Sequence, residues 1–181
     1  MPEESLMGIA RPAAPVRLIC ALCYREESDR DSACDQLERA WGPISARTEP
    51  FPFIHTTYYE AEMGEGLRKF YCAFKQLIEP MEIVAIKLAT NQIEAGLATA
   101  GRRRVNIDPG YIEAAKLVLA TTKNFSHRIY LGQGIYGDVQ LFWQGGRFKS
   151  NPWTYADYLD PAILEFFTSI RQDFMKEGKN Q

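Results

Sequence analysis

The stretch Val16–Tyr24 constrains the fold more than any other part of the chain. Its sequence, VRLICALCY, has one charged residue, Arg17, among branched, aromatic and sulfur-containing side chains. Successive side chains of a strand point to opposite faces of a sheet, so a strand of this composition is apolar on both faces. The sequence therefore predicts a central strand that other elements cover on each side.

Three predicted helices are candidates for that cover. Ser28 is expected to cap the first, which stops before Gly42. The second has Pro80 at its first position and ends near Gly101. The third is capped by Asp160 and carries apolar residues at helical spacing over most of its length. Each helix has an apolar stripe that must be buried against a sheet or another helix.

Alternating side chains predict further strands. They are expected at Ile44–Glu49, Lys69–Lys75, Val105–Ile107, Lys116–Thr121, Arg128–Leu131 and Gly134–Trp143, the last turning into Phe148. Asp108-Pro109-Gly110 is interpreted as a turn, and residues 111–122 fit either a strand or a helix. The segment between Pro50 and Tyr58 is too rich in proline for a central strand.

The order of these elements predicts an α+β fold. Strand, helix, strand, strand, helix and strand make a ferredoxin-like βαββαβ core, which additional antiparallel strands and a C-terminal helix extend. We expect a flexible N-terminal tail at residues 1–15, because that segment is rich in proline and alanine and has no period. Residues 16–181 are predicted to form a single α+β domain.

The charge balance argues against nucleic acid and membranes as partners. With 21 Lys+Arg against 23 Asp+Glu, the formal net charge is −2, so the chain lacks an overall positive field. Its uncharged apolar runs are shorter than the roughly 20 residues of a membrane span, and its N-terminus lacks the pattern of a signal peptide. We therefore expect a cytoplasmic protein.

The cysteines fit that compartment. Cys20 and Cys23 form a Cys-x-x-Cys, but residues three apart in a strand point to opposite faces, which suits neither a redox pair nor half of a zinc site. Cys34 and Cys72 are isolated in the sequence. We predict buried, reduced thiols.

The stretch 102–138 is the expected functional site, because it places many polar groups between short apolar runs. Lys116, Lys123, Arg128 and Arg104 are candidates for binding a small anionic ligand, phosphorylated compounds included. Guanidinium groups bind phosphate and carboxylate in a bidentate manner, and lysine adds a point charge. The alternative interpretation is that these residues are solvated strand ends.

His127 and Asp108 are the candidate catalytic residues. Histidine can act as a general acid or base near neutral pH, whereas a structural histidine beside Asp108 or Tyr136 is the alternative. Asp108 and Asp138 are candidate magnesium ligands, or else a turn-forming and a strand-edge carboxylate. The candidate ligand-contacting rings are Tyr130, Tyr136, Trp153 and Tyr155, of which the last two could instead cover the core.

Several longer motifs carry a resemblance to a known family. They are NIDPGY at 106–111, LATTK at 119–123, HRIYLG at 127–132 and PWTYADY at 152–158, together with FPF at 51–53, YYEAEMG at 58–64 and GIY at 134–136. On these motifs the chain resembles a bacterial family catalogued as domain of unknown function 4416, from about Val16 to the closing helix. It departs from the family's pattern at His55 and Gly137.

Some members of that family are labelled GTP-binding proteins, and this sequence gives the label no support. A P-loop needs Gly-x-x-x-x-Gly-Lys-Ser/Thr, in which backbone amides surround phosphate. The glycine-rich runs at 64–66 and 132–134 lack the lysine and hydroxyl at that spacing. The resemblance therefore implies membership of the family and no particular reaction.

Two hypotheses from different classes remain. The first is a small-molecule-binding protein or enzyme acting on an anionic ligand, which requires residues of the 104–138 stretch to share one pocket. The second is a noncatalytic interaction module, or a homo-oligomer, in which the aromatic loops Phe51–Tyr59 and Trp153–Tyr158 contact a partner. No motif in the chain fixes a reaction.

Overall fold

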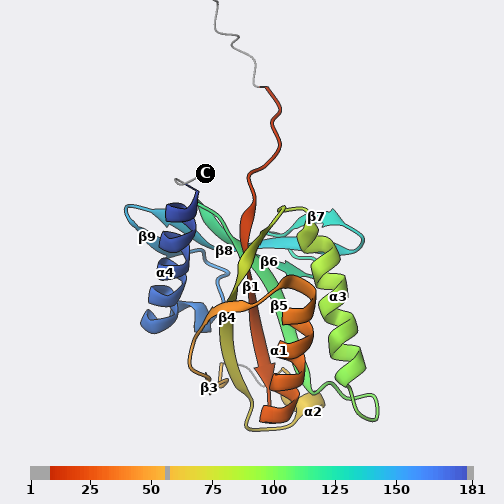
Figure 1. The fold of residues 1–181 in the computed structure, drawn as a ribbon. Helices are drawn as coiled ribbons and strands as arrows, with labels where there is room; N and C mark the ends of the chain where they lie inside the picture. Colours follow the sequence, from red (N-terminus) through yellow and green to blue (C-terminus); the bar gives the residue numbers. More distant parts are fainter. Residues whose placement is uncertain (1–8, 56–57, 179–181) are drawn as a thin grey trace, which may run out of the picture.

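An antiparallel sheet with helices on both faces organises the protein. The structure is a computed structural model that describes residues 9–55 and 58–178 (Figure 1). The strands are β1 (Val16–Tyr24), β2 (Ile44–Arg47), β3 (Phe51–Pro52), β4 (Arg68–Ile78), β5 (Val105–Ile112), β6 (Lys116–Thr121), β7 (Ile129–Gly132), β8 (Ile135–Gln144) and β9 (Arg147–Ser150). The helices are α1 (Glu27–Trp41), α2 (Glu60–Met63), α3 (Glu82–Leu97), the short 3-10 helix η1 (Ala156–Leu159) and α4 (Pro161–Glu177).

The strand order is β2-β4-β1-β5-β6-β8-β7, with β3 paired to β4 and β9 paired to β8. All pairs of neighbouring strands are antiparallel. The predicted α+β class is confirmed. The strands assigned to the βαββαβ core lie side by side as β2-β4-β1-β5, whereas the ferredoxin-like class as such stays a prediction.

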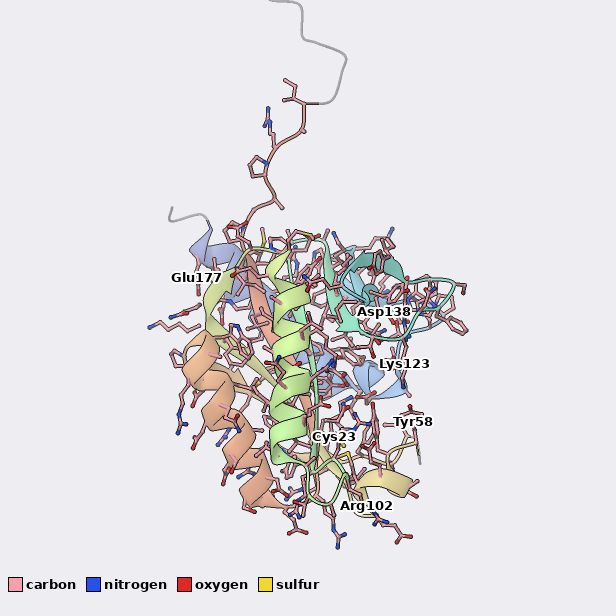
Figure 2. The ribbon with its side chains drawn as sticks, turned by 90° about the vertical axis from the view of Figure 1, so that its right-hand side faces the viewer. Cys23, Tyr58, Arg102, Lys123, Asp138 and Glu177 are labelled. Carbon is pink, nitrogen blue, oxygen red and sulfur yellow. The ribbon has the colours of Figure 1, made fainter. Side chains whose placement is uncertain are left out.

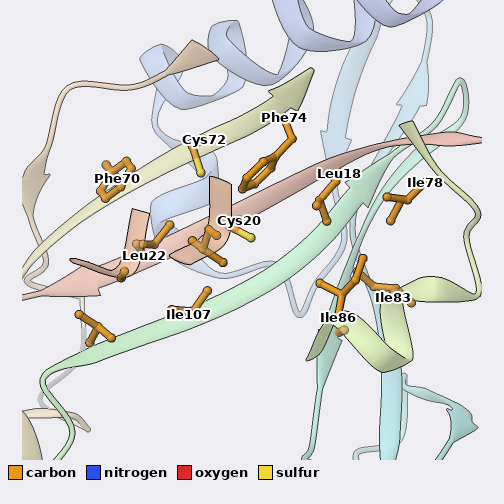
Figure 3. Packing of buried hydrophobic residues seen from close by; sticks show 14 of the residues in the cluster. Leu18, Cys20, Leu22, Phe70, Cys72, Phe74, Ile78, Ile83, Ile86 and Ile107 are labelled. Atoms are coloured by element: carbon orange, nitrogen blue, oxygen red, sulfur yellow. The ribbon is translucent and has the colours of Figure 1, made fainter. Parts of the chain in front are cut away.

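The two-sided burial predicted for β1 is confirmed, because all of its residues are buried. Leu18, Cys20 and Leu22 point to the face that α1 and α3 cover, where they pack with residues such as Ile83 of α3 (Figure 3). Ile19 and its same-face neighbours pack under α4 on the other side of the sheet. The alternation also separates the cysteines, since Cys20 and Cys23 belong to different clusters.

Helix α4 covers part of the second face. The helix lies beside β9 (Figure 1). Its residues Ile163, Phe167 and Ile170 belong to a buried cluster with residues of β1, β4 and β6. Asp160 caps the helix as predicted, accepting a hydrogen bond from the backbone N–H of Ala162 at 2.8 Å. Full burial of a side chain such as Phe167 contributes about 3 kcal/mol to the packing of the helix on the sheet.

The turn predicted at Asp108-Pro109-Gly110 is wrong, because these residues lie within β5. Gly110 lets β5 approach β6 closely, since an added Cβ would lie 2.3 Å from the backbone oxygen of Val118. The N–H of Ile107 points away from β1 and bonds to a side chain of α3 rather than to a strand. The backbone nitrogen of Pro109, two residues later in the strand, points in the same direction. Proline is therefore tolerated there without loss of a ladder hydrogen bond.

Other predicted boundaries need smaller corrections. Ser28 does not cap α1, because the helix starts earlier and the N–H groups of Asp29 and Arg30 bond to the Glu26 carbonyl oxygen. Residues 111–122 contain the end of β5 and strand β6, so the helical alternative is wrong. Phe51 and Pro52 form a short edge strand, and α3 begins after Pro80.

The N-terminal tail is described only in part, because residues 1–8 lie outside the described residues. Residues 9–15 are exposed and contain no helix or strand. In the described part of the chain, no helix combines the length and the hydropathy that crossing a bilayer requires.

Candidate functional site

The sheet opens between β5 and β6. These strands pair only where Gly110–Ile112 lies opposite Leu117–Leu119. Continued in the same register, Asp108 would lie opposite Thr121, but no pairing is present there. A cavity of about 550 Å³ occupies this opening, with lining residues from β1, β4, β5, β6, α3 and η1. Its volume lies within the range of about 300–1,000 Å³ that small-molecule sites span.

Side chains of α3 replace the missing strand partner of Ile107. The Lys87 ammonium donates to the Ile107 carbonyl oxygen at 2.8 Å, and the Ile107 N–H donates to Glu94 Oε1 at 2.6 Å. Both groups are needed because buried backbone N–H and C=O groups must be paired. The helix thereby supplies two ionisable residues to the cavity wall.

Small side chains of the central strand β1 leave space at the base of the cavity. Ala21 lies between Tyr71 of β4 and Asp108 of β5, and Cys23 lies between Lys69 and Asn106. Burial raises the pKa of the Cys23 thiol to about 12. The thiol is therefore protonated at neutral pH and serves as a small apolar floor residue rather than a nucleophile.

One wall holds a buried ion pair. Lys69 Nζ donates to Asp157 Oδ2 at 2.5 Å, and the Tyr71 hydroxyl donates to the same oxygen. The Lys69 ammonium also lies 4.9 Å from the centre of the Phe53 ring and 5.6 Å from that of Tyr158. The charge of Lys69 is thus paired with a carboxylate and surrounded by aromatic rings.

Asp108 sits opposite that wall. Its Oδ1 accepts from Lys87 Nζ at 3.2 Å and its Oδ2 accepts from Asn106 Nδ2 at 2.7 Å. Burial alone would raise the pKa of this carboxyl, but the ammonium groups of Lys87 and Lys69 and the hydrogen bond from Asn106 outweigh it and hold the pKa below the usual value. Asp108 is therefore an anion at neutral pH.

Arg103 closes the end of the cavity next to α3. Its Nε and Nη2 donate to the two oxygens of Glu62 at 2.8 and 2.6 Å, and its Nη1 donates to Asn106 Oδ1 at 2.9 Å. The guanidinium also lies 3.4 Å from Glu94 Oε2 and 5.5 Å from the centre of the Tyr59 ring. Burial is the main cause that raises the pKa of Glu94.

Lys123 and Tyr58 lie at the mouth of the cavity. The Lys123 ammonium is 4.0 Å from the centre of the Tyr58 ring, and both residues are exposed (Figure 2). A hydrogen bond from Lys123 is the main cause that lowers the pKa of Tyr58. The mouth therefore combines a positive charge with an aromatic ring.

Tyr158 contributes an unpartnered polar atom. Its side chain is 0 % exposed and lines the cavity, and its hydroxyl has no hydrogen-bond partner among residues 9–55 and 58–178. Leaving a buried hydroxyl unpaired costs about 1–3 kcal/mol. The ring itself stacks on Phe167 at 5.5 Å between centroids and seals the core.

A second group of polar side chains, the Asp138 cluster, adjoins the cavity. It consists of Asp138, His127, Arg128, Gln140 and Tyr155. Asp138 accepts from Arg128 Nε at 2.9 Å, lies 3.3 Å from His127 Nε2 and accepts from Gln140 Nε2 at 2.8 Å. The other two Arg128 nitrogens donate to the Lys123 carbonyl oxygen and the Tyr155 hydroxyl, both at 2.9 Å. This cluster fastens two loops to β8.

The structure separates the residues that the sequence proposed for one site. Asp108, Lys123, Asp138 and Tyr155 line the cavity. His127, Arg128 and Trp153 lie in or against the Asp138 cluster, where the Trp153 ring stacks on His127 at 4.7 Å. Four others lie away from the lining: Arg104 pairs with Asp29, Lys116 pairs with Glu113, and the Tyr130 and Tyr136 rings contact each other at 5.3 Å.

Several lining residues were not proposed from the sequence, and one signal could have found them. Lys87, Asn91 and Glu94 recur at helical spacing beside the apolar stripe of α3, a pattern that also fits a solvated helix face. Lys69 reaches the lining through the pairing of β4 with β1 and has no local signal, whereas Arg103 and Asn106 lie within the 102–138 stretch that the sequence indicated.

The described residues contain no group of three or more His, Cys, Asp or Glu side chains suited to hold a metal ion. Both oxygens of Asp108 and both of Asp138 already accept hydrogen bonds or lie next to His127. A cation that bound there would have to share these oxygens with Lys87 or Arg128.

Comparison with known proteins identifies a family. A family model described as a domain of unknown function (DUF4416) matches residues 14–174, most of the chain, and confirms the resemblance seen in the sequence motifs. No curated protein and no solved structure matches the chain.

Proposed function

The chain belongs to the DUF4416 family, and from the geometry of its cavity we propose that it binds a small anionic molecule between β5 and β6. Phosphorylated compounds are the leading class, because an ammonium group and a set of hydrogen-bonding groups suit phosphate. The proposal concerns binding, and it assigns no reaction.

The position of Lys123 carries this proposal. The other lysines and the arginine of the lining, Lys69, Lys87 and Arg103, each pair with a carboxylate. Across residues 9–55 and 58–178, Lys123 has no carboxylate within ion-pair distance. Its charge is therefore available to an anion at the cavity mouth.

The interior supports the same conclusion. Buried charged groups are costly, and groups of them around a concave space are more frequent at functional sites than elsewhere. Phe53, Tyr59 and Tyr155 add aromatic surface to the cavity wall.

A thermal-shift screen tests the proposal. Inorganic phosphate, sugar phosphates, nucleotides and carboxylates are added to the parent, to Lys123→Ala and to the matched control Lys116→Ala. A ligand at about a hundred times its Kd adds about 2.7 kcal/mol of stability, which raises the Tm by several degrees. We expect a shift that Lys123→Ala loses and Lys116→Ala keeps. No shift with any compound, or equal loss in both variants, contradicts the proposal.

Magnesium enters as a further arm of the same screen, because Asp108 and Asp138 both line the cavity. If the ion assists, the shift caused by phosphate compounds grows with added magnesium in the parent. That increment should disappear in Asp108→Asn. An increment that survives the substitution assigns the ion to the free ligand in solution.

A second candidate function is supported by the free edge of the sheet. β7 is the last strand in the order, and its Ile129 and Tyr130 side chains are 69 % and 60 % exposed. An exposed apolar edge strand can pair with another chain, so this edge could join two copies of the protein. Light scattering at several concentrations tests it, with Ile129→Lys expected to abolish any dimer.

A further inference from the structure

We propose that the anionic ligand also carries an amino group, which donates hydrogen bonds to Asp108 inside the cavity. The ligand class is thus an amine-bearing phosphate, with the phosphate at Lys123 and the amine at Asp108. This inference rests on the proposed function, because it assumes that the cavity binds an anion.

Asp108 is the accessible carboxylate of the cavity. Its side chain is 31 % exposed, against 6 % for Glu94, 2 % for Asp138 and 4 % for Asp157, the other acidic residues that line the described cavity. The three less exposed carboxylates are packed among their protein partners. A ligand therefore meets negative charge chiefly at Asp108.

Asp108 also has unused capacity as an acceptor. A carboxylate has about four acceptor positions, and one on each oxygen is taken, by Lys87 and by Asn106. The depressed pKa of Asp108 keeps the group ionised at neutral pH, so it accepts and does not donate. A ligand group at this position must be a donor, and an ammonium donates most strongly.

The two ends of the cavity differ in charge. Its interior presents the partly exposed Asp108 carboxylate as an acceptor, whereas its mouth presents the Lys123 ammonium.

Both residues belong to the same cavity. Asp108 lines it from β5, and Lys123 lines it from the segment that follows Thr121, the last residue of β6. A hexosamine phosphate is a small molecule that carries both an amine and a phosphate. A ligand with phosphate at both ends would place negative charge against Asp108 and be repelled.

Matched pairs of probes test the inference. Glucosamine 6-phosphate is compared with glucose 6-phosphate, and phosphoethanolamine with 2-hydroxyethyl phosphate, by calorimetry on the parent protein. We expect the amine to bind about tenfold more tightly than its hydroxyl counterpart in at least one pair. In Asp108→Asn that ratio should fall to about one, whereas Lys123→Ala should weaken both members of a pair equally.

The outcomes separate the two proposals. Equal affinities within both pairs of the parent overturn the amine inference and leave the anion site standing. No binding of any phosphate compound, including those of the wider screen, overturns both. A preference for the amine that survives in Asp108→Asn also overturns the inference. Circular dichroism confirms that Asp108→Asn is folded, and the parent comparison decides the matter even if that variant is unstable.

Discussion

The cavity and the Asp138 cluster are neighbouring groups of similar residues, yet they differ in how far their hydrogen bonds are satisfied. In the Asp138 cluster, all three types of Arg128 nitrogen donate within the protein, and Asp138 accepts on both oxygens. At the cavity, Asp108 is partly exposed. Among the described residues, Lys123 has no carboxylate partner and the Tyr158 hydroxyl has no hydrogen-bond partner.

The difference shows that charge and position in the sequence do not distinguish a binding group from a structural one. Arg128 is a better anion binder than Lys123 by residue type, but its guanidinium is committed to loops that contain Lys123 and Tyr155. Lys123 is held in place by that network and keeps its own ammonium available. His127 and Arg128 thus lie outside the cavity lining, whereas Asp138 and Tyr155 of the same cluster form part of it.

Replacing the two aspartates should give the largest contrast. Asp138→Ala leaves the nearly buried Arg128 guanidinium without its carboxylate, and breaking such a pair costs about 3–5 kcal/mol. Asp108→Ala should cost less, about 1–2 kcal/mol, because Lys87 keeps its bond to the Ile107 carbonyl oxygen. Urea unfolding of both variants measures the difference. Equal losses would mean that the two regions are structurally equivalent.

Replacing the cationic residues Arg128 and Lys123 should also destabilise the Asp138 cluster more than the cavity. Arg128→Ala removes three hydrogen bonds that join β8 to two loops, and we expect a loss of about 2 kcal/mol. Lys123→Ala removes an exposed side chain and should change stability by less than about 0.5 kcal/mol while abolishing phosphate binding. A strongly destabilised Lys123→Ala, with binding intact, would reverse the roles of these residues.

The smallest effect concerns Glu94 and pH. Burial raises the pKa of this carboxyl above its usual 4.5, so the folded protein holds the proton more tightly than the unfolded chain does. The free energy of unfolding contributed by Glu94 therefore falls as the pH rises from 4.5 through the raised pKa. Asp108, whose pKa is lowered, acts in the opposite sense and loses its stabilisation only as the pH falls below its usual 3.8.

Glu94→Gln should remove that fall while keeping a side-chain oxygen for the Ile107 N–H. Urea denaturation between pH 4.5 and 7 measures the free energy of unfolding of both proteins. We expect the value for the variant, relative to that for the parent, to increase as the pH rises. Glu60→Gln, on the exposed side of α2, is the matched control. If the free energies of unfolding of the parent and of Glu94→Gln changed in parallel with pH, burial would not raise the pKa of Glu94.

Local patterns predicted much of the framework. The apolar run of β1 specified a strand covered on both faces, and Asp160 with Pro161 marked the start of α4. These features depend on side chains close together in the sequence, so their period and capping chemistry are sufficient. The family motifs likewise identified the family.

The errors arose where distant residues decide the local structure. Asp108-Pro109-Gly110 has the composition of a turn, but pairing with β1 along its length and the close approach of β6 at Gly110 keep it extended. Residues 111–122 were ambiguous for the same reason, since short apolar runs fit either period until their partners are known.

The sequence was sufficient to predict that β1 is covered on both faces, that the fold is α+β and that the chain resembles its family. Each of these predictions follows from periodicity or motifs within short stretches. The cavity required the tertiary structure. It exists because β5 and β6 part beyond Gly110 and because Lys87 and Glu94 reach from α3 to the backbone of Ile107. Whether a charged side chain is paired or available depends on contacts between residues far apart in the chain, and no local pattern contains that information.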